Sequence, residues 1–152
     1  MRSEKTWRGT FPVSPEAISA TAEWLEATVG NENLSDRLIY SLKLCVDELM
    51  SNTLLHGCQN RKEVVASIQI KLSTSRVELI YEDNGLLFDV TNAPERRLNM
   101  PLEEIEPGGL GLKLVREFSS ELRYENIPNG NRIICIFVRN AQQSWQDVKN
   151  RY

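Results

Sequence analysis

The chain has 152 residues, of which 41% are hydrophobic and 26% are charged, and its formal net charge is -3. This composition is typical of a soluble globular protein, and the absence of a Lys/Arg-rich block argues against direct binding to nucleic acid. No apolar run approaches the roughly 18 residues of a membrane span, and residues 1–5 lack the apolar segment of a secretory signal. We therefore expect one cytoplasmic domain covering residues 1–152.

The three cysteines are Cys45, Cys58 and Cys135. They lie far apart in the sequence and are odd in number, so free thiols are expected. Cys58 lies in a polar loop after a helix, where it is either a reactive thiol or simply a small residue.

A strand is predicted over residues 6–13, where apolar and polar residues alternate until Pro12. A helix follows from Ser14, because serine caps helix N-termini and Pro15 suits the first helical turn. Gly30 is its expected end.

A second helix is predicted from the capping residue Ser35 to Gly57. Its packed stripe comprises Leu38, Leu42, Val46, Leu49 and Thr53, and Leu44, Leu54 and Leu55 widen it. The helix is therefore expected to be covered over most of its surface.

Glu48, Asn52 and His56 follow one another at intervals of four residues, so they line one side of this second helix together with Ser41 and Cys45. A carboxylate and a carboxamide within an otherwise apolar helix are costly to bury without a function. This side is therefore expected to face a cleft. Asp47 is rotated about 100° away and is interpreted as a surface or capping charge.

Two strands are predicted over residues 66–72 and 77–82, where apolar residues alternate with polar ones. A short Ser/Thr turn joins them into a hairpin. The second strand leads into Asp83, Asn84 and Gly85. This places a carboxylate at the end of a strand, close to a glycine that permits a flat ring to approach the backbone.

Residues 86–107 are irregular and contain three prolines, and a loop of this length is usually functional or mobile. Gly108, Gly109 and Gly111 then open a short helix predicted over residues 111–118. Backbone amides left bare at a helix N-terminus bind phosphates. This pattern is neither a Walker A loop nor a Rossmann fingerprint.

Two further strands are predicted over residues 122–126 and 133–138, joined by a hairpin turn at 128–131. The second is continuously apolar, which predicts a central strand covered on both faces. Residues 139–152 are expected to form a polar C-terminal tail. Helices separated from antiparallel strands indicate an α+β fold: a two-layer α/β sandwich with a mixed, mostly antiparallel sheet and helices on one face.

Each motif also has an ordinary structural explanation. Asn52 can bond only the sheet, Glu48 can orient a metal-bound water, and an Asp-Asn-Gly turn is common. The glycines before residue 112 can form a hinge. His56 is interpreted as packing at a helix end, and Arg96 and Arg97 as a solvated charge cluster.

Taken together, the motifs resemble the GHKL (histidine kinase-like) ATPase superfamily. Glu48-Leu49-Met50-Ser51-Asn52 with His56-Gly57 resembles its N box, Asp83-Asn84-Gly85 its G1 box, and Gly108-Gly109-Leu110-Gly111-Leu112 its G2 box. The resemblance covers nearly the whole chain and is strongest to bacterial anti-sigma factor serine kinases of the RsbW and SpoIIAB type. Phe88-Asp89 after the G1 box and Gly130-Asn131 before the last strand favour that branch.

The resemblance implies the Bergerat (histidine kinase-like ATPase) fold and a site for ATP and Mg²⁺. It assigns Asn52 as the metal ligand, Glu48 as the catalytic base, and Asp83 with Gly85 as the adenine-binding pair. Gly108, Gly109, Leu110 and Gly111 would bind the phosphates. The sequence departs from the family at Leu87, which replaces a second glycine that the G1 box often contains.

By resemblance, the chain is expected to be an ATP-dependent protein-serine kinase. It would phosphorylate a STAS-domain anti-sigma factor antagonist, sequester a sigma factor and form a homodimer. The alternative is a nucleotide-gated binding module of the same fold without phosphotransfer activity. Neither alternative involves a membrane or direct contact with nucleic acid.

Overall fold

The computed structural model describes residues 3–92 and 109–139. The elements in chain order are β1 (Lys5–Pro12), α1 (Pro15–Val29), α2 (Asp36–Asn52), the π-helix η1 (Thr53–Gly57), β2 (Val65–Leu72), β3 (Arg76–Asp83), the 3-10 turn η2 (Val90–Asn92), α3 (Gly109–Phe118), β4 (Glu121–Ile127) and β5 (Gly130–Val138). None of the helices in these ranges has the length and apolar character needed to span a bilayer.

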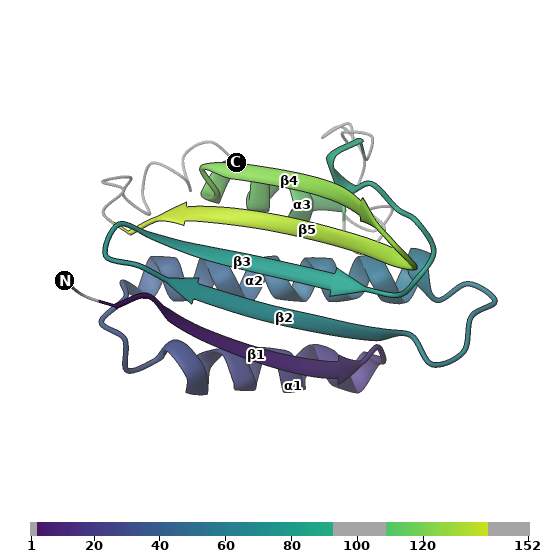
Figure 1. The fold of residues 1–152 in the computed structure, drawn as a ribbon, viewed down its shortest axis with the longest axis horizontal. Coiled ribbons are helices and arrows are strands. Elements are labelled where there is room, and N and C mark those ends of the chain that lie inside the picture. Colours follow the sequence, from purple (N-terminus) through teal and green to yellow (C-terminus); the bar gives the residue numbers. More distant parts are fainter. Residues whose placement is uncertain (1–2, 93–108, 140–152) are drawn as a thin grey trace.

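The strands form one five-stranded sheet in the order β1-β2-β3-β5-β4. Every pairing described is antiparallel. The helices α1, α2 and α3 all lie behind the sheet, on the same face (Figure 1). The expected two-layer α+β sandwich with helices on one face is therefore confirmed, and its described sheet contains no parallel pair.

Both predicted helix caps are present. The Ser14 hydroxyl accepts a hydrogen bond from the amide of Ala17, and the Ser35 hydroxyl accepts one from Leu38, each at 3.2 Å. Each bond satisfies one of the amides that a helix N-terminus leaves without an intrahelical partner. These caps fix where α1 and α2 begin.

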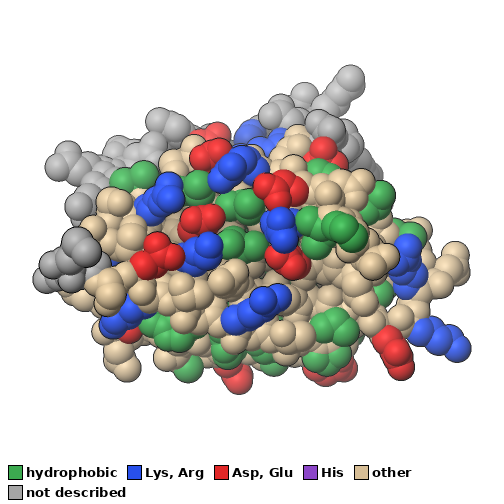
Figure 2. Space-filling view, viewed as in Figure 1, with side chains coloured by type: hydrophobic (Ala, Val, Ile, Leu, Met, Phe, Trp, Pro, Cys, Tyr) green, Lys and Arg blue, Asp and Glu red, His purple; other side chains and the backbone are tan. Residues whose placement is uncertain are grey.

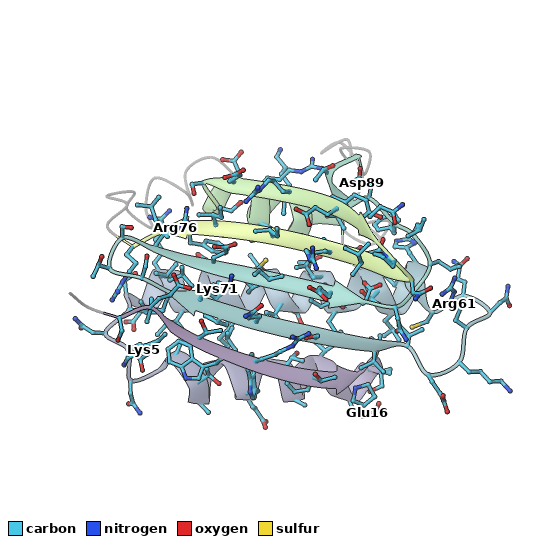
Figure 3. The ribbon with its side chains drawn as sticks, in the orientation of Figure 1. Lys5, Glu16, Arg61, Lys71, Arg76 and Asp89 are labelled. Atoms are coloured by element: carbon cyan, nitrogen blue, oxygen red, sulfur yellow. The ribbon has the colours of Figure 1, made fainter. Side chains whose placement is uncertain are left out.

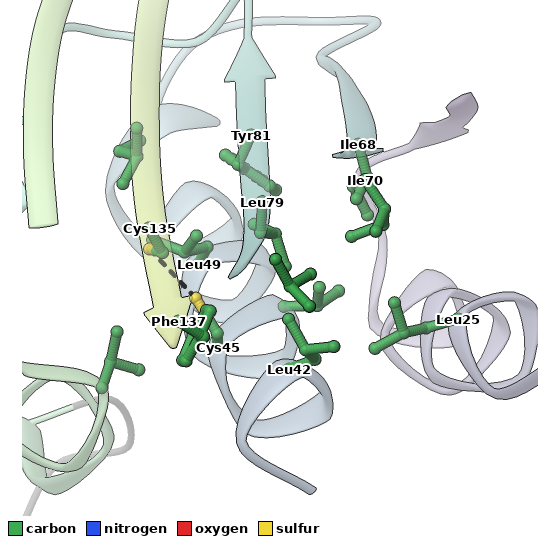
Figure 4. Packing of buried hydrophobic residues seen from close by; sticks show 14 of the residues in the cluster. Leu25, Leu42, Cys45, Leu49, Ile68, Ile70, Leu79, Tyr81, Cys135 and Phe137 are labelled. Atoms are coloured by element: carbon green, nitrogen blue, oxygen red, sulfur yellow. Dashed lines mark hydrogen bonds between the residues drawn. The ribbon is translucent and has the colours of Figure 1, made fainter. Parts of the chain in front are cut away.

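The core lies between the sheet and the three helices (Figure 4). Its largest fully buried side chains include Leu25 of α1, Leu42 and Leu49 of α2, and Leu79 and Phe137 of the sheet. The predicted stripe of α2 is buried as expected. Leu55 is the exception: it is 43% exposed, because at about 100° per residue it lies on the side of the helix opposite the stripe that contains Leu42 and Leu49.

The prediction that residues 133–138 form a central strand covered on both faces is confirmed for residues 133–137, which are all buried, whereas Val138 is 49% exposed. β5 is an interior strand between β3 and β4, but no described helix covers its second face. There Ile134 and Ile136 pack with Ile80 in a small separate cluster. Figure 2 shows this face as apolar side chains between Lys/Arg and Asp/Glu side chains. Neighbouring long side chains, rather than a second layer, shield these isoleucines.

Charged pairs cross the strands on this open face. Arg132 of β5 donates to Glu82 of β3 at 2.9 Å and to Glu125 of β4 at 3.0 Å. These side chains remain partly exposed, so each pair contributes little stability beyond holding the strands in register.

All three cysteines are free thiols, as expected. Cys45 of α2 and Cys135 of β5 lie side by side in the core, with 3.2 Å between their sulfur atoms (Figure 4). Burial and the nearby charge of Asp83 raise the pKa of the Cys58 thiol. A raised pKa lowers the thiolate fraction, which argues against the hypothesis that Cys58 is reactive.

Candidate nucleotide-binding site

The candidate residues gather at one end of the sheet. β3 runs toward this end and finishes at Asp83, and α2 finishes there at Asn52. Figure 3 marks the same end with Arg61 and Asp89, and the opposite end with Lys5. A small pocket at this end is lined by Leu49, Asn52, Thr53, Gly57, Asp83, Leu86, Phe88, Val90, Asn131 and Ile133.

α3 points its N-terminus toward the same end. Its C-terminal residue Phe118 lies under the guanidinium of Arg37, which is in the first turn of α2. The amide of Ser120, just past α3, bonds to Ile136 at 2.8 Å. α2 and α3 are therefore antiparallel, and Gly109 at the start of α3 faces the end of α2 that carries Asn52.

The third predicted motif is only partly described. Gly109, Leu110 and Gly111 form the first turn of α3, which begins two residues earlier than predicted. Gly108 lies outside the described residues, as do Arg96, Arg97 and the tail from residue 140.

Glu48 and Asn52 carry polar atoms without a partner in the part of the chain that the structure describes. The Oε2 atom of Glu48 and the Nδ2 atom of Asn52 are both buried and accept or donate no hydrogen bond. Asn52 is only 5% exposed. A buried polar group left unpaired costs about 1–3 kcal/mol, so two such groups one helical turn apart indicate a ligand site.

Burial raises the pKa of the Glu48 carboxyl above its ordinary value, and the negative charge of Asp47 adds to this. Folded Glu48 therefore binds its proton more tightly than unfolded Glu48. Its contribution to stability is fully present below the unfolded pKa and is lost as the pH rises through the raised folded pKa.

The Glu48→Gln variant tests this dependence, because glutamine does not titrate. We expect the free energy of unfolding of the wild type, minus that of the variant, to decrease between about pH 4 and pH 7. Denaturant unfolding across this range measures it. A difference that stays constant with pH would show that burial does not raise the pKa of Glu48.

Asp83 is held by three donors. Its Oδ1 atom accepts from the Gly85 amide and from the Asn131 side-chain amide, each at 2.9 Å, and its Oδ2 atom accepts from the Thr53 hydroxyl at 2.8 Å. The Tyr81 hydroxyl lies 2.7 Å from that of Thr53. Burial raises the pKa of Tyr81 and keeps its hydroxyl protonated; when Thr53 gives its single proton to Asp83, Tyr81 is the donor of this pair.

Gly85 is required by close packing of two backbones. A Cβ atom at this position would lie 2.9 Å from the Gly57 carbonyl oxygen and 3.0 Å from the Gly57 Cα. The amide of Leu86 also donates to the Gly57 carbonyl at 3.0 Å. Glycine therefore allows the loop after β3 to dock on the end of η1.

The Gly85→Ala variant is expected to lower the free energy of unfolding by about 1–3 kcal/mol, because neither backbone can move aside without breaking this contact. Chemical denaturation measures the change. Gly30→Ala is not a suitable control, since its Cβ would also meet a backbone oxygen. Leu87→Ala, two residues later in the same loop and 60% exposed, tests whether the effect is specific to the glycine.

His56 stacks on Phe88, with 4.5 Å between the ring centroids and 14° between the ring planes. This contact agrees with its interpretation as packing at a helix end, and it adds a second link between η1 and the loop after β3. Leu87, at the position where the family often has glycine, points to solvent and is 60% exposed.

Sequence reasoning missed three contributors to this site. Thr53 was expected only to pack, yet it bonds Asp83. Asn131 was noted as part of a turn and of the family resemblance, but not as a partner of Asp83. Arg116 of α3 donates to the carbonyls of Val90 and Thr91 at 2.9 and 2.7 Å, which holds the pocket wall at Val90. These bonds to Asp83, Val90 and Thr91 all join residues at least 25 positions apart, so local patterns carry no signal for them.

A larger cavity, of about 370 Å³, lies at the opposite end of the sheet beside Lys5, Glu32 and Arg139. It contains none of the predicted residues. Lys5 is paired with Glu32 at 2.8 Å, and Arg139 donates to the Ser73 carbonyl at 2.7 Å, so its charged groups are already satisfied. The end that carries Asp83 is therefore the better candidate for the functional site.

Residues 11–137 match the family model of the histidine kinase-like ATPase domain. The chain belongs to the histidine kinase-like ATPase family. The match includes the N-box, G1-box and G2-box residues and all the elements from α1 to β4.

Among curated relatives of this ATPase domain, the serine/threonine-protein kinase BtrW of Bordetella bronchiseptica is 31% identical over 126 residues, covering 82% of this chain and 89% of BtrW. An anti-sigma F factor of Clostridium kluyveri is 30% identical over 126 residues, covering 82% of this chain and 83% of that protein.

A solved structure of the RsbU and RsbW domains of a Mycobacterium tuberculosis protein superimposes with a TM-score of 0.61 at 14% identity. It covers 89% of this chain, which spans 32% of that longer chain. This likeness shows the fold.

Proposed function

We propose that this ATPase domain is an ATP-dependent protein-serine kinase that phosphorylates a STAS-domain anti-sigma factor antagonist and sequesters a sigma factor. The names of two relatives, one a serine/threonine-protein kinase and one an anti-sigma F factor, support this function. The observation that carries the proposal is the pair of unpartnered buried groups on Glu48 and Asn52, at the end of the sheet where Asp83 lies.

In this proposal, Asn52 binds Mg²⁺ through its carboxamide oxygen. Mg²⁺ prefers oxygen ligands and keeps several waters, so one protein ligand together with phosphate oxygens is sufficient. The residue fits this role because one end of its buried amide has no protein partner. Rotating the amide by half a turn exchanges its oxygen and nitrogen within the same space.

Glu48 acts as the general base. As the serine hydroxyl of the antagonist forms a bond to the γ-phosphorus, the bond from that phosphorus to the oxygen bridging it to the β-phosphate breaks. The hydroxyl proton passes to the Glu48 carboxylate, and the products are phosphoserine and ADP. The raised pKa of Glu48 makes it a stronger base than an exposed carboxylate.

The remaining predicted residues position the nucleotide. Asp83 accepts a hydrogen bond from the amino group of adenine, while Gly85 donates to Asp83 through its amide and lets the loop after β3 dock on Gly57. The amides of Gly109, Leu110 and Gly111, in the first turn of α3, bind phosphate together with Gly108. This orientation brings the phosphates toward Asn52, since α3 starts at the end where α2 finishes.

Phosphate transfer to a STAS-domain protein tests the proposal. The chain is incubated with Mg²⁺, ATP labelled at the γ-phosphate and STAS proteins encoded near its gene, and we expect labelled phosphoserine on one of them. Tight ATP binding without transfer would instead support the nucleotide-gated module, which the exposed Leu87 in the G1 box favours. We also propose a homodimer, which sedimentation can measure.

A further inference from the structure

Asn131, the second residue of β5, makes four hydrogen bonds and is only 3% exposed. Its Nδ2 atom donates to Asp83 Oδ1 and to the Leu86 carbonyl, each at 2.9 Å. Its Oδ1 atom accepts from the Phe88 amide at 3.0 Å and from the Tyr124 hydroxyl at 2.6 Å. One side chain therefore connects β3, β4, β5 and the loop after β3.

These four bonds use the whole hydrogen-bonding capacity of the Asn131 amide, which has two donors and one oxygen with two lone pairs. They also set its orientation, because a carboxylate and a carbonyl can only accept, and the Phe88 amide can only donate. No donor or acceptor of the Asn131 side chain remains for a bound ligand. It acts through the residues that it holds.

The residue it holds most directly is Asp83. A carboxylate has about four lone-pair sites. In Asp83, the Gly85 amide and Asn131 occupy both sites of Oδ1, and Thr53 occupies one site of Oδ2. One acceptor site remains, on Oδ2.

We propose that Asn131 is the positioning residue that directs this last acceptor of Asp83 at the base of the bound nucleotide, and that Tyr124 of β4 holds Asn131 in place. The inference rests on the proposed ATP binding. An acceptor aimed at the 6-position of a purine favours an amino group there and disfavours a carbonyl, which would face the carboxylate oxygen to oxygen.

Tyr124 supplies the fourth bond from the edge strand β4. Burial, together with the charges of Asp89 and Asp83, raises the pKa of its hydroxyl, so it stays protonated and donates to Asn131. The Tyr124→Phe variant removes this donor alone and leaves the ring in place. It therefore tests the link from Tyr124 through Asn131 to Asp83 without introducing a new charge.

The experiment compares the binding of ATP with that of inosine triphosphate, which carries a 6-oxo group in place of the amine. In Asn131→Asp, an oxygen replaces the nitrogen that donates to Asp83 and Leu86. We expect the ratio of the two affinities to fall about tenfold in this variant, the size expected for a hydrogen bond to a charged group. A smaller fall in the same direction is expected for Tyr124→Phe.

Asn126→Asp is the matched control. Asn126 pairs with Asn131 across β4 and β5, its side chain is exposed, and the chemical change is identical. We expect both affinities to stay at the wild-type values. A purely structural role of Asn131 would weaken ATP and inosine triphosphate equally and leave their ratio unchanged.

The outcomes separate this inference from the proposed function. A wild-type protein that does not bind ATP contradicts the proposed function. A wild-type protein that prefers ATP, with variants that keep the same ratio, overturns the role of Asn131 alone. Equal wild-type affinity for the two nucleotides also overturns it. If Asn131→Asp does not fold, Tyr124→Phe decides the question.

Discussion

Replacing Glu48 with glutamine is expected to lower the rate of phosphate transfer about 10²- to 10⁴-fold, the usual contribution of a general base. Glutamine keeps the size and one oxygen of the side chain but cannot accept the serine proton. Affinity for ATP should change little, because the base acts on the hydroxyl of the partner protein. Single-turnover transfer from labelled ATP, with ATP affinity measured separately by calorimetry, shows whether the loss lies in chemistry or in binding.

Asp47→Asn is the matched control for this change. Asp47 precedes Glu48 on α2 but lies about 100° around the helix, so its carboxylate is not expected to take part in transfer. Its negative charge contributes to the raised pKa of Glu48, so the variant should keep the maximal rate and shift the acidic limb of the rate profile to lower pH. Full transfer by Glu48→Gln, or its loss in Asp47→Asn, would show that the base is assigned incorrectly.

Replacing Asn52 with leucine is expected to change function and stability in opposite directions. Without the carboxamide, Asn52→Leu has no side-chain ligand for Mg²⁺, and Mg²⁺-dependent ATP binding should fall about 100-fold. The free energy of unfolding should rise by about 1 kcal/mol, because a nearly isosteric apolar side chain replaces a buried amide that lacks a full set of partners. Calorimetry with Mg²⁺-ATP and denaturant unfolding measure the two effects.

Asn126→Leu provides the comparison, since Asn126 is an exposed asparagine on β4. It should leave ATP binding intact and alter the free energy of unfolding by less than about 0.5 kcal/mol. If Asn52→Leu keeps normal Mg²⁺-dependent binding, Asn52 is not the metal ligand. If it lowers stability, the amide has a structural partner.

The elements of the fold were predictable where the signal is local. Ser14 and Ser35 cap helices through bonds to amides three residues away, so short stretches of sequence contain the whole interaction. The strands of the β2–β3 hairpin were evident from alternation, because a strand buried on one face needs apolar residues at every second position. The helix α2 was predictable from its apolar stripe as far as Asn52.

Prediction was incomplete where the structure depends on distant neighbours. The apolar run of β5 indicated two covered faces, but only the tertiary arrangement shows that one of them is shielded by side chains of β3 and β4. The end of the π-helix that follows α2 packs at Gly57 against the backbone of Gly85, 28 positions later, and no local pattern predicts this contact.

The sequence by itself determined which residue types are available for the site, because a carboxylate and a carboxamide spaced four apart on an apolar helix are recognisable without coordinates. Only the tertiary structure decided how those groups are held. Asp83 owes its orientation to Thr53, 30 positions earlier, and to Asn131, 48 positions later. Hydrogen bonds of this kind depend on distances of about 3 Å between atoms of different strands and helices, and such distances exist only once the sheet and its helices have packed.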